Sequence, residues 1–269
     1  MDEAALRAAS ELMLAARRER RLLPELLSAN PAFDVDAAYQ VARINFDALT
    51  QAGERSVGRK IGFTNRGIWE QYKVDQPIWA HMYASTVHRL AERDHAFPFA
   101  TFCNPRIEPE IIIKFGRAPQ VAEPKAIAAC IEWVAHGFEI VDCHFPDWKF
   151  AVADTIADFA LHRALFVGPP VSPERIPNIV ETLSGFQIAL SCDGAVVDRG
   201  RGSNVLDGPL QAIAHLMQVL AGQERFAPLA AGEIITTGTL TAAWPIAAGQ
   251  CWHTTIDGVD LPGATLRFT

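Results

Sequence analysis

The sequence predicts an α+β fold, with helices at the front of the chain and strands behind them. Two observations carry this prediction. The first fifty-odd residues place alanine and leucine at helical spacing, whereas the chain beyond Pro169 and Pro170 is rich in strand patterns. At 269 residues, of which 49% are hydrophobic, the chain is long enough to bury a substantial core. We expect an N-terminal helical segment at residues 1–55 and a larger domain at residues 56–269.

The front of the chain carries two helical patterns and then a short strand. Residues 2–21 and 34–53 have helical spacing, and Asp34 is available as the N-cap of the second helix. A strand-like stretch follows at residues 58–65, between glycines. It holds Lys60, which is either a surface lysine or, if partly buried, an acid or base of lowered pKa.

Residues 66–83 predict a helix or loop. Here Pro77 and Trp79 lie between Asp75 and His81. This composition is typical of a loop anchored by a tryptophan, and also of a lid that covers a site. Both interpretations stay open at this point.

Residues 104–114 place two carboxylates in an apolar, strand-like run. Side chains alternate along an extended chain, so Glu108 and Glu110 point to the same face. Like charges this close repel each other and favour a cation between them. The pattern is also typical of the solvated face of a half-buried sheet. The unbroken apolar run at residues 111–113 and the nearby Arg106 favour a covered strand instead.

A third carboxylate, Glu139, lies in a similar apolar run at residues 138–142. Between the two acidic runs, residues 125–137 predict a helix that ends at Gly137. If the two strands are neighbours, the three carboxylates form an all-oxygen set. Such a set suits Mg²⁺ or Mn²⁺ better than Zn²⁺.

The rest of the chain is β-rich. Residues 142–168 hold an unusual density of ionisable groups, His162 among them, beside apolar residues. The elements predicted further on are a hairpin at Asp193-Gly194, strands at residues 233–241 and 251–268, and a helix at residues 209–220.

Composition excludes several classes of protein. A net charge of −7 without a basic stripe argues against a nucleic-acid partner. The five cysteines are scattered and odd in number, which indicates reduced thiols in the cytosol. Residues 1–21 contain early acidic residues and no long apolar run, so they predict neither a signal peptide nor a membrane span. We therefore expect a cytoplasmic protein.

Several short motifs follow one another along most of the chain. They are GRKIGFTN (58–65), VDQPIW (74–79), PRIEPEI (105–111), FEIVDCHFPDWKF (138–150), ADTIAD (153–158) and TGTLT (237–241). In this order and spacing they resemble the 2-keto-4-pentenoate hydratases and 4-oxalocrotonate decarboxylases of the fumarylacetoacetate hydrolase superfamily.

The resemblance implies a mixed β-roll behind the helical segment, so residues 56–269 become a metal-binding catalytic domain. It implies that Glu108, Glu110 and Glu139 hold Mg²⁺ or Mn²⁺, and that Lys60 orients or protonates the substrate. Asp75 and His81 are weaker catalytic candidates. The residues expected to contact the substrate are Arg106, His162 and Thr239. Homo-oligomers are expected, alone or in complex with a related decarboxylase or hydratase.

The resemblance also implies a metal-dependent hydratase, a lyase of aromatic catabolism. It would add water to a 2-hydroxy-2,4-dienoate such as 2-hydroxypenta-2,4-dienoate and give a 4-hydroxy-2-oxo acid. Chelation of the substrate carboxylate and 2-oxygen stabilises the enolate on which this reaction depends. A decarboxylase would use the same stabilisation.

Two residues depart from the hydratase pattern. Ile78 stands where typical hydratases carry an acid, and Leu161 stands where a small hydroxyl is expected. Both changes indicate a more apolar pocket. The alternatives are therefore a decarboxylase of 4-oxalocrotonate type, which Ile78 favours, then an acylpyruvate C–C hydrolase, or a non-catalytic partner subunit.

Overall fold

A computed structural model describes residues 1–90 and 95–269. Its helices are α1 (Glu3–Glu19), α2 (Val35–Gln51), α3 (Trp69–Tyr72), α4 (Pro124–Ala128), α5 (Val152–Ala157), α6 (Ile179–Gly185) and α7 (Pro209–Ala221). Its strands are β1 (Ser56–Gly62), β2 (Ile78–Tyr83), β3 (Val87–Arg89), β4 (His95–Phe97), β5 (Pro105–Phe115), β6 (Ile131–Asp142), β7 (His162–Val167), β8 (Gln187–Cys192), β9 (Ala195–Arg201), β10 (Ile234–Thr239), β11 (Trp244–Pro245), β12 (Cys251–Asp257) and β13 (Thr265–Phe268). The predicted α+β class is confirmed.

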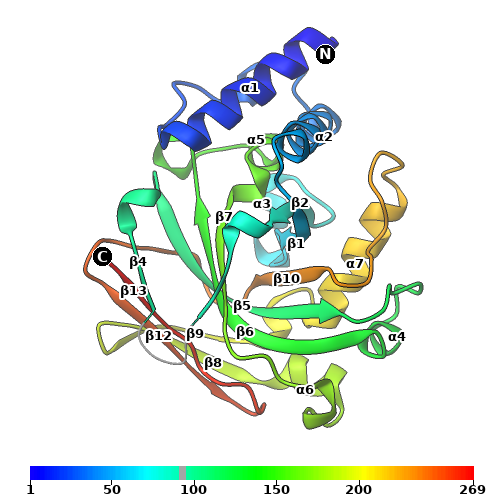
Figure 1. The fold of residues 1–269 in the computed structure, drawn as a ribbon, viewed down its shortest axis with the longest axis vertical. Coiled ribbons are helices and arrows are strands. Elements are labelled where there is room, and N and C mark those ends of the chain that lie inside the picture. The colour runs from blue at the N-terminus through cyan, green and yellow to red at the C-terminus, as the bar shows by residue number, and fades with distance from the viewer. Residues whose placement is uncertain (91–94) are drawn as a thin grey trace.

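The two predicted N-terminal helices form α1 and α2, which pack together at one end of the molecule (Figure 1). Each begins at an aspartate cap. Asp2 accepts a hydrogen bond from the Ala5 amide, and Asp34 accepts one from the Ala37 amide at 2.9 Å. None of the described helices is long and apolar enough to cross a membrane. The division of the chain at residue 55 stays a prediction.

The larger sheet is mixed and has the order β2-β1-β10-β5-β6-β7-β3, with β11 also paired to β5. Its long central pair, β5 and β6, is antiparallel, so the two acidic strands are direct neighbours as the sequence requires for a shared site. β1 is parallel to β10, and β10 is antiparallel to β5. β1 therefore lies one strand away from the acidic pair.

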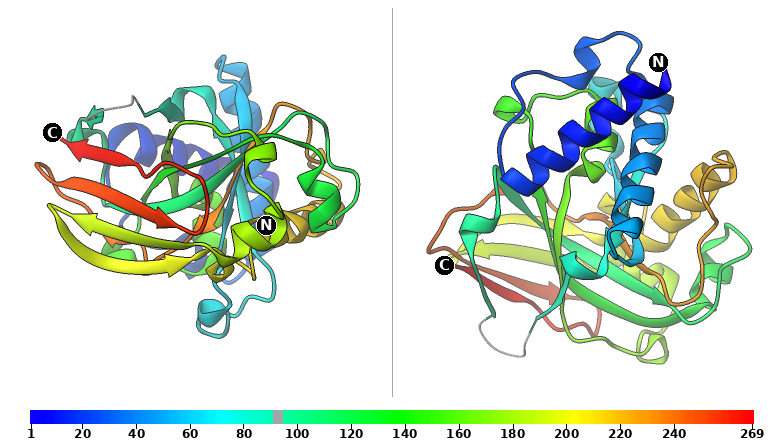
Figure 2. Two further views of the ribbon diagram at one scale, coloured as in Figure 1. Left: turned by 90° about the horizontal axis from the view of Figure 1, so that it is seen from below. Right: turned by 45° about the horizontal axis from the view of Figure 1, so that its top comes forward.

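A smaller sheet with the order β4-β13-β12-β8-β9 packs against the long strands, as the views in Figure 2 show. The two sheets share a hydrophobic core to which β6 contributes Phe138 and Ile140, while β12 and β13 contribute Trp252 and Leu266. The predicted hairpin at Asp193-Gly194 is confirmed and joins β8 to β9. This packing buries the second face of the β5–β6 pair.

The helix predicted at residues 125–137 is wrong beyond its first turn. α4 ends at Ala128, and β6 already begins at Ile131. Gly137 lies inside β6 rather than at a helix end, and an added Cβ would lie 2.0 Å from the Phe166 carbonyl oxygen. The small residues of this stretch mimic helical spacing, but pairing with β5 and β7 on both sides decides the strand.

The lid suggested by Pro77 and Trp79 is also absent from the described structure. Residues 78–83 form β2, and the Trp79 side chain is buried against Tyr39 and Phe226. Its indole N–H donates to Gln223 Oε1 at 2.9 Å. Trp79 is thus an anchor in the core beneath the helices.

Candidate metal centre and its cavity

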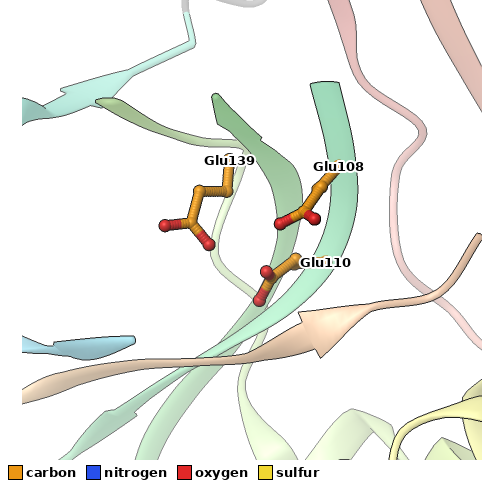
Figure 3. A group of neighbouring side chains, drawn as sticks. All are labelled: Glu108, Glu110 and Glu139. Atoms are coloured by element: carbon orange, nitrogen blue, oxygen red, sulfur yellow. The ribbon is translucent and has the colours of Figure 1, made fainter. Parts of the chain in front are cut away.

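The register of β5 and β6 brings the three predicted carboxylates together. Glu108 pairs with Glu139, and Glu110 lies opposite Gly137. One oxygen from each carboxylate lies within 4.8 Å of the others. Figure 3 shows the three side chains converging on one small space from the two strands. The alternation predicted from the sequence thus produces a compact all-oxygen cluster.

Lys60 of β1 faces this cluster from across β10. Its Nζ lies 3.3 Å from Glu139 Oε2 and 3.8 Å from Glu108 Oε2, and the side chain is only 4% exposed. Burial by itself lowers the pKa of Lys60, but the Glu139 and Glu108 carboxylates outweigh burial and raise the pKa above its ordinary value. The lowered pKa expected for a buried lysine is therefore wrong, and Lys60 carries a positive charge.

The three carboxylates differ in electrostatics. Burial raises the pKa of Glu108 to about 7, against the opposing charge of Lys60. Burial, followed by the neighbouring Glu139 and Glu108 charges, raises the pKa of Glu110 well above its ordinary value. Burial acts in the same direction on Glu139, but Lys60 and His162 outweigh it and hold its pKa at about 2. One lysine thus leaves part of the cluster's charge without compensation.

The cluster fits a divalent cation. Glu110 Oε2 accepts a hydrogen bond from the Gly238 amide at 2.8 Å, but within the described chain the buried Glu110 Oε1 accepts none, and Glu139 Oε2 faces the Lys60 ammonium at 3.3 Å. Buried oxygens of this kind are costly unless something positive binds them. Clustered carboxylate oxygens are ligands that Mg²⁺, Mn²⁺ and Ca²⁺ accept. A cation would compensate the charge and the open oxygens together.

His162 lies behind the metal cluster rather than on the substrate cavity. Its Nδ1 is 2.7 Å from Glu139 Oε1, its Nε2 is 2.8 Å from Thr86 Oγ1, and the residue is fully buried. Burial lowers the pKa of His162 despite the Glu139 charge. His162, predicted to contact the substrate, is not among the residues that line the cavity, and its ring contacts a carboxylate of the cluster.

A cavity of about 360 Å³ opens beside the cluster. Its polar lining includes Lys60, Glu108, Arg106, Thr239 and Thr241. Its apolar lining includes Ile61, Phe63, Ile68, Tyr72, Ile78, Val141, Trp148, Phe150, Ala160 and Leu161. The cavity therefore combines a charged end at the carboxylates with a wide apolar wall.

Leu161 reaches the cavity from a strained turn. Phe159, Ala160 and Leu161 have φ values of 56°, 49° and 64°, in the left-handed region that residues other than glycine rarely adopt. The turn joins α5 to β7 and delivers Leu161 to the cavity while His162 continues to Glu139. Leu161 and Ile78, the two residues that depart from the hydratase pattern, therefore both line the cavity.

The remaining predicted residues divide into two groups. Arg106 and Thr239 line the cavity. Asp75 is exposed on the surface and is not among the lining residues. His81 packs against Phe46 and Trp79, and burial lowers its pKa to about 3. The structure does not bring Asp75 or His81 to the cavity, so we assign neither a catalytic role.

The aromatic lining escaped the sequence analysis. Phe63 and Tyr72 come from the loop and short helix after β1, whereas Trp148 and Phe150 follow β6. Three of these rings, Phe63, Trp148 and Phe150, lie within the motifs at residues 58–65 and 138–150, and this was the signal available in the sequence. Their convergence depends on tertiary structure.

Comparison with known proteins agrees with this geometry. Residues 65–262 match the fumarylacetoacetate (FAA) hydrolase C-terminal family. A 2-keto-4-pentenoate hydratase of Burkholderia vietnamiensis strain G4 is 32% identical over 253 residues, 93% of each chain. A 4-oxalocrotonate decarboxylase from a Pseudomonas species is 31% identical over 224 residues, 83% of each chain. The structure of 4-oxalocrotonate decarboxylase from Pseudomonas putida G7, complexed with magnesium and adipate, has a TM-score of 0.89 and 25% identity, and the match covers 100% of this chain and 99% of that one.

Proposed function

The chain belongs to the fumarylacetoacetate hydrolase family, and on that premise we propose that it is a metal-dependent hydratase. This lyase adds water to a 2-hydroxy-2,4-dienoate and yields a 4-hydroxy-2-oxo acid. The observation that carries the proposal is the cluster of three carboxylates with Lys60 at the end of a cavity, in a chain about a third identical to a hydratase.

Glu108, Glu110 and Glu139 would hold the divalent cation, with Mg²⁺ or Mn²⁺ preferred for an all-oxygen set. When bound, the cation polarises the 2-oxygen of the substrate and stabilises negative charge that develops there. Arg106 lies two residues before Glu108 on β5 and lines the cavity, where it pairs with the substrate carboxylate. Thr239 pairs with Glu110 across β10 and β5 and also lines the cavity, and its hydroxyl donates to the Thr241 carbonyl at 3.0 Å and keeps its acceptor capacity for the substrate.

Lys60 acts as a charged donor in this proposal. Its raised pKa keeps its protons bound near neutrality, so the ammonium orients an enolate oxygen by hydrogen bonding. The substrate gains a proton at C5 while its 2-hydroxyl loses one, which gives a 2-oxo-3-enoate. Water then adds across C3 and C4, with oxygen on C4 and hydrogen on C3. The net change is the addition of one water molecule.

The test is a proton NMR time course with 2-hydroxypenta-2,4-dienoate and 4-oxalocrotonate in one tube, first with Mg²⁺ and then with chelator. We expect 4-hydroxy-2-oxopentanoate to appear from the dienoate only when metal is present. The Glu108→Ala variant should lose this turnover. Full activity in that variant, or in chelator, would overturn the assignment.

A decarboxylase is the second candidate. Buried Ile78 lines the cavity where a typical hydratase carries an acid, and a decarboxylase is among the relatives of similar identity. The same time course separates the two reactions, because selective conversion of the six-carbon diacid to the dienoate identifies a decarboxylase. A cytoplasmic location and a homo-oligomeric assembly complete the proposal.

A further inference from the structure

Four aromatic rings and one guanidinium form a continuous row along the cavity, here called the aromatic row. The ring centres of Phe63 and Tyr72 are 5.0 Å apart, edge to face, and those of Tyr72 and Phe150 are 5.6 Å apart and stacked. Phe150 lies 6.2 Å from Trp148, whose ring carries the Arg106 guanidinium at 4.0 Å. The row thus links the end of β1 to β5.

The aromatic row is only partly buried by the protein itself. All four rings keep some solvent exposure where they line the cavity with Leu161 and Ile78. Apolar surface held open to water in a concave site is typical of a surface that a ligand covers. The backbone supports the same conclusion, because Phe63, Trp148 and Leu161 all have positive φ values, between 56° and 64°.

The cavity is larger than a five-carbon substrate needs. At roughly 30 Å³ for each water-sized group, a volume of about 360 Å³ holds about twelve such groups. A five-carbon dienoate with its three oxygens fills about two thirds of that number. The remaining space lies beside a wall that offers apolar contacts. A phenyl substituent, with six carbon atoms, fills that space and extends by about two groups toward the opening of the cavity.

Charge is confined to one end of the cavity. Among the described lining residues, the cationic side chains are Lys60 and Arg106. Lys60 is engaged by Glu108 and Glu139, and Arg106 lies beside Glu108 on the same strand face. The middle of the aromatic row, at Tyr72 and Phe150, contributes no charged group. A second carboxylate at the far end of a substrate would be desolvated there without a cationic partner among the described lining residues.

We propose, resting on the hydratase assignment above, that the natural substrate is a 2-hydroxy-2,4-dienoate whose C5 carries a bulky apolar substituent, an aryl group in particular. The substituent packs against the aromatic row and Leu161, while the oxygens face the carboxylate cluster. Hydration moves one proton to C5 and adds the elements of water across C3 and C4. The substituent itself does not react, and C5 becomes the CH₂ group that carries it. The preceding reaction must supply an aryl-substituted dienoate.

The test compares unreactive 2-oxo acids that share one chelating head. Binding of 2-oxo-5-phenylpentanoate, 2-oxopentanoate and 2-oxohexanedioate to the Mg²⁺-loaded protein is measured by titration calorimetry. We expect the phenyl compound to bind roughly thirtyfold more tightly than 2-oxopentanoate because it buries a ring. The diacid should bind no better than 2-oxopentanoate.

Variants of Tyr72 assign the preference to the aromatic row. Tyr72→Ala removes its central ring and should reduce the advantage of the phenyl compound about tenfold, whereas Tyr72→Phe should keep it. Phe99→Ala, a partly exposed ring that does not line the cavity, is the matched control and should change nothing. These effects concern binding, so they are separate from catalytic rate.

Each outcome decides one of the two proposals. Equal affinities, or tightest binding of the diacid, overturn the inference about the substituent, while hydration of the simple dienoate still decides the hydratase assignment. Tightest binding of the phenyl compound without hydration of any dienoate upholds the substituent and overturns the hydratase. Metal-independent binding of all three acids, or no binding at all, overturns both.

Discussion

The protein buries two groups of carboxylates, and the two groups are satisfied in opposite ways. Asp142, Asp154 and Asp158 are almost completely buried where residues 142–158 meet the N-terminal segment. Of the glutamates of the metal centre, Glu110 and Glu139 are buried on the central strands of the larger sheet, and Glu108 is partly exposed to the cavity. Both groups remove negative charge from water, yet only the first is fully provided with donors.

The aspartates are held by nearby amides and side chains. Asp154 accepts hydrogen bonds from the amides of Ser28 and Ala151 at 2.9 and 2.8 Å, and from the Ser28 hydroxyl at 2.6 Å. Asp142 accepts from the amides of Cys103 and Asn104. These bonds tie the connection between α1 and α2 and the start of β5 to the β6 region. Their role is structural.

The glutamates lack this provision. Glu110 receives one amide hydrogen bond and shares its space with two other carboxylates, so its charged form is disfavoured. A buried acid whose oxygens all accept hydrogen bonds therefore has a structural role. Buried acids that cluster with oxygens left without a hydrogen bond indicate a site for a cation.

The Glu110→Gln variant gives the largest expected effect. It removes one ligand and should lower metal-dependent kcat/KM by about a thousandfold or more. Unfolding of the metal-free variant in urea should show equal or greater stability, because a repulsive charge disappears. Glu132→Gln is the control on the neighbouring strand β6, since Glu132 is exposed and paired with Lys114. A marked fall in the free energy of unfolding of Glu110→Gln would instead show that Glu110 has a structural role like that of the aspartates.

The Asp154→Asn variant should behave in the reverse manner. Its amide group would face backbone N–H donors, so we expect the free energy of unfolding to fall by about 3 kcal/mol. Activity per folded molecule should change little. Asp34→Asn is the control, because asparagine caps an exposed helix as well as aspartate does. A normal free energy of unfolding together with lost turnover would show that Asp154 serves the reaction rather than the fold, against the structural role given to the aspartates.

Much of this arrangement follows from the sequence. Period-two alternation put Glu108 and Glu110 on one face, and a second acidic strand suggested a shared site. The segment before Glu139 was misassigned because its small residues fit both helical and strand spacing, and burial between two neighbours made the choice. The contact of His162 with Glu139 depends on a register shift between Ile140 and Val141, which no local pattern reveals. The aromatic row joins loops that are distant in sequence.

Cation binding at the three glutamates should stabilise the folded protein, and the size of this effect should depend on pH. At one hundred times Kd, Mg²⁺ should add about 2.7 kcal/mol to the free energy of unfolding. Because burial raises the pKa of Glu108 to about 7, its neutral form favours the metal-free fold at low pH, and that contribution is lost as the pH rises through about 7. Protons compete with the cation below that value. The metal-induced increase in Tm should therefore be large at pH 8 and small at pH 5.5, and equal increases would contradict the cluster.

His162 has features of both groups of residues. It is buried and fully hydrogen-bonded, as the aspartates are, and it contacts a carboxylate of the metal centre. His162→Phe removes the partner of Glu139 Oε1 and should weaken Mg²⁺ binding about tenfold by calorimetry. His162→Asn, which keeps a donor, should restore part of that affinity. A purely structural role would lower the unfolding free energy of His162→Phe and leave the affinity of the folded protein unchanged. Loss of affinity with recovery in the asparagine variant instead assigns His162 to the site, because only orientation of Glu139 connects it to the cation.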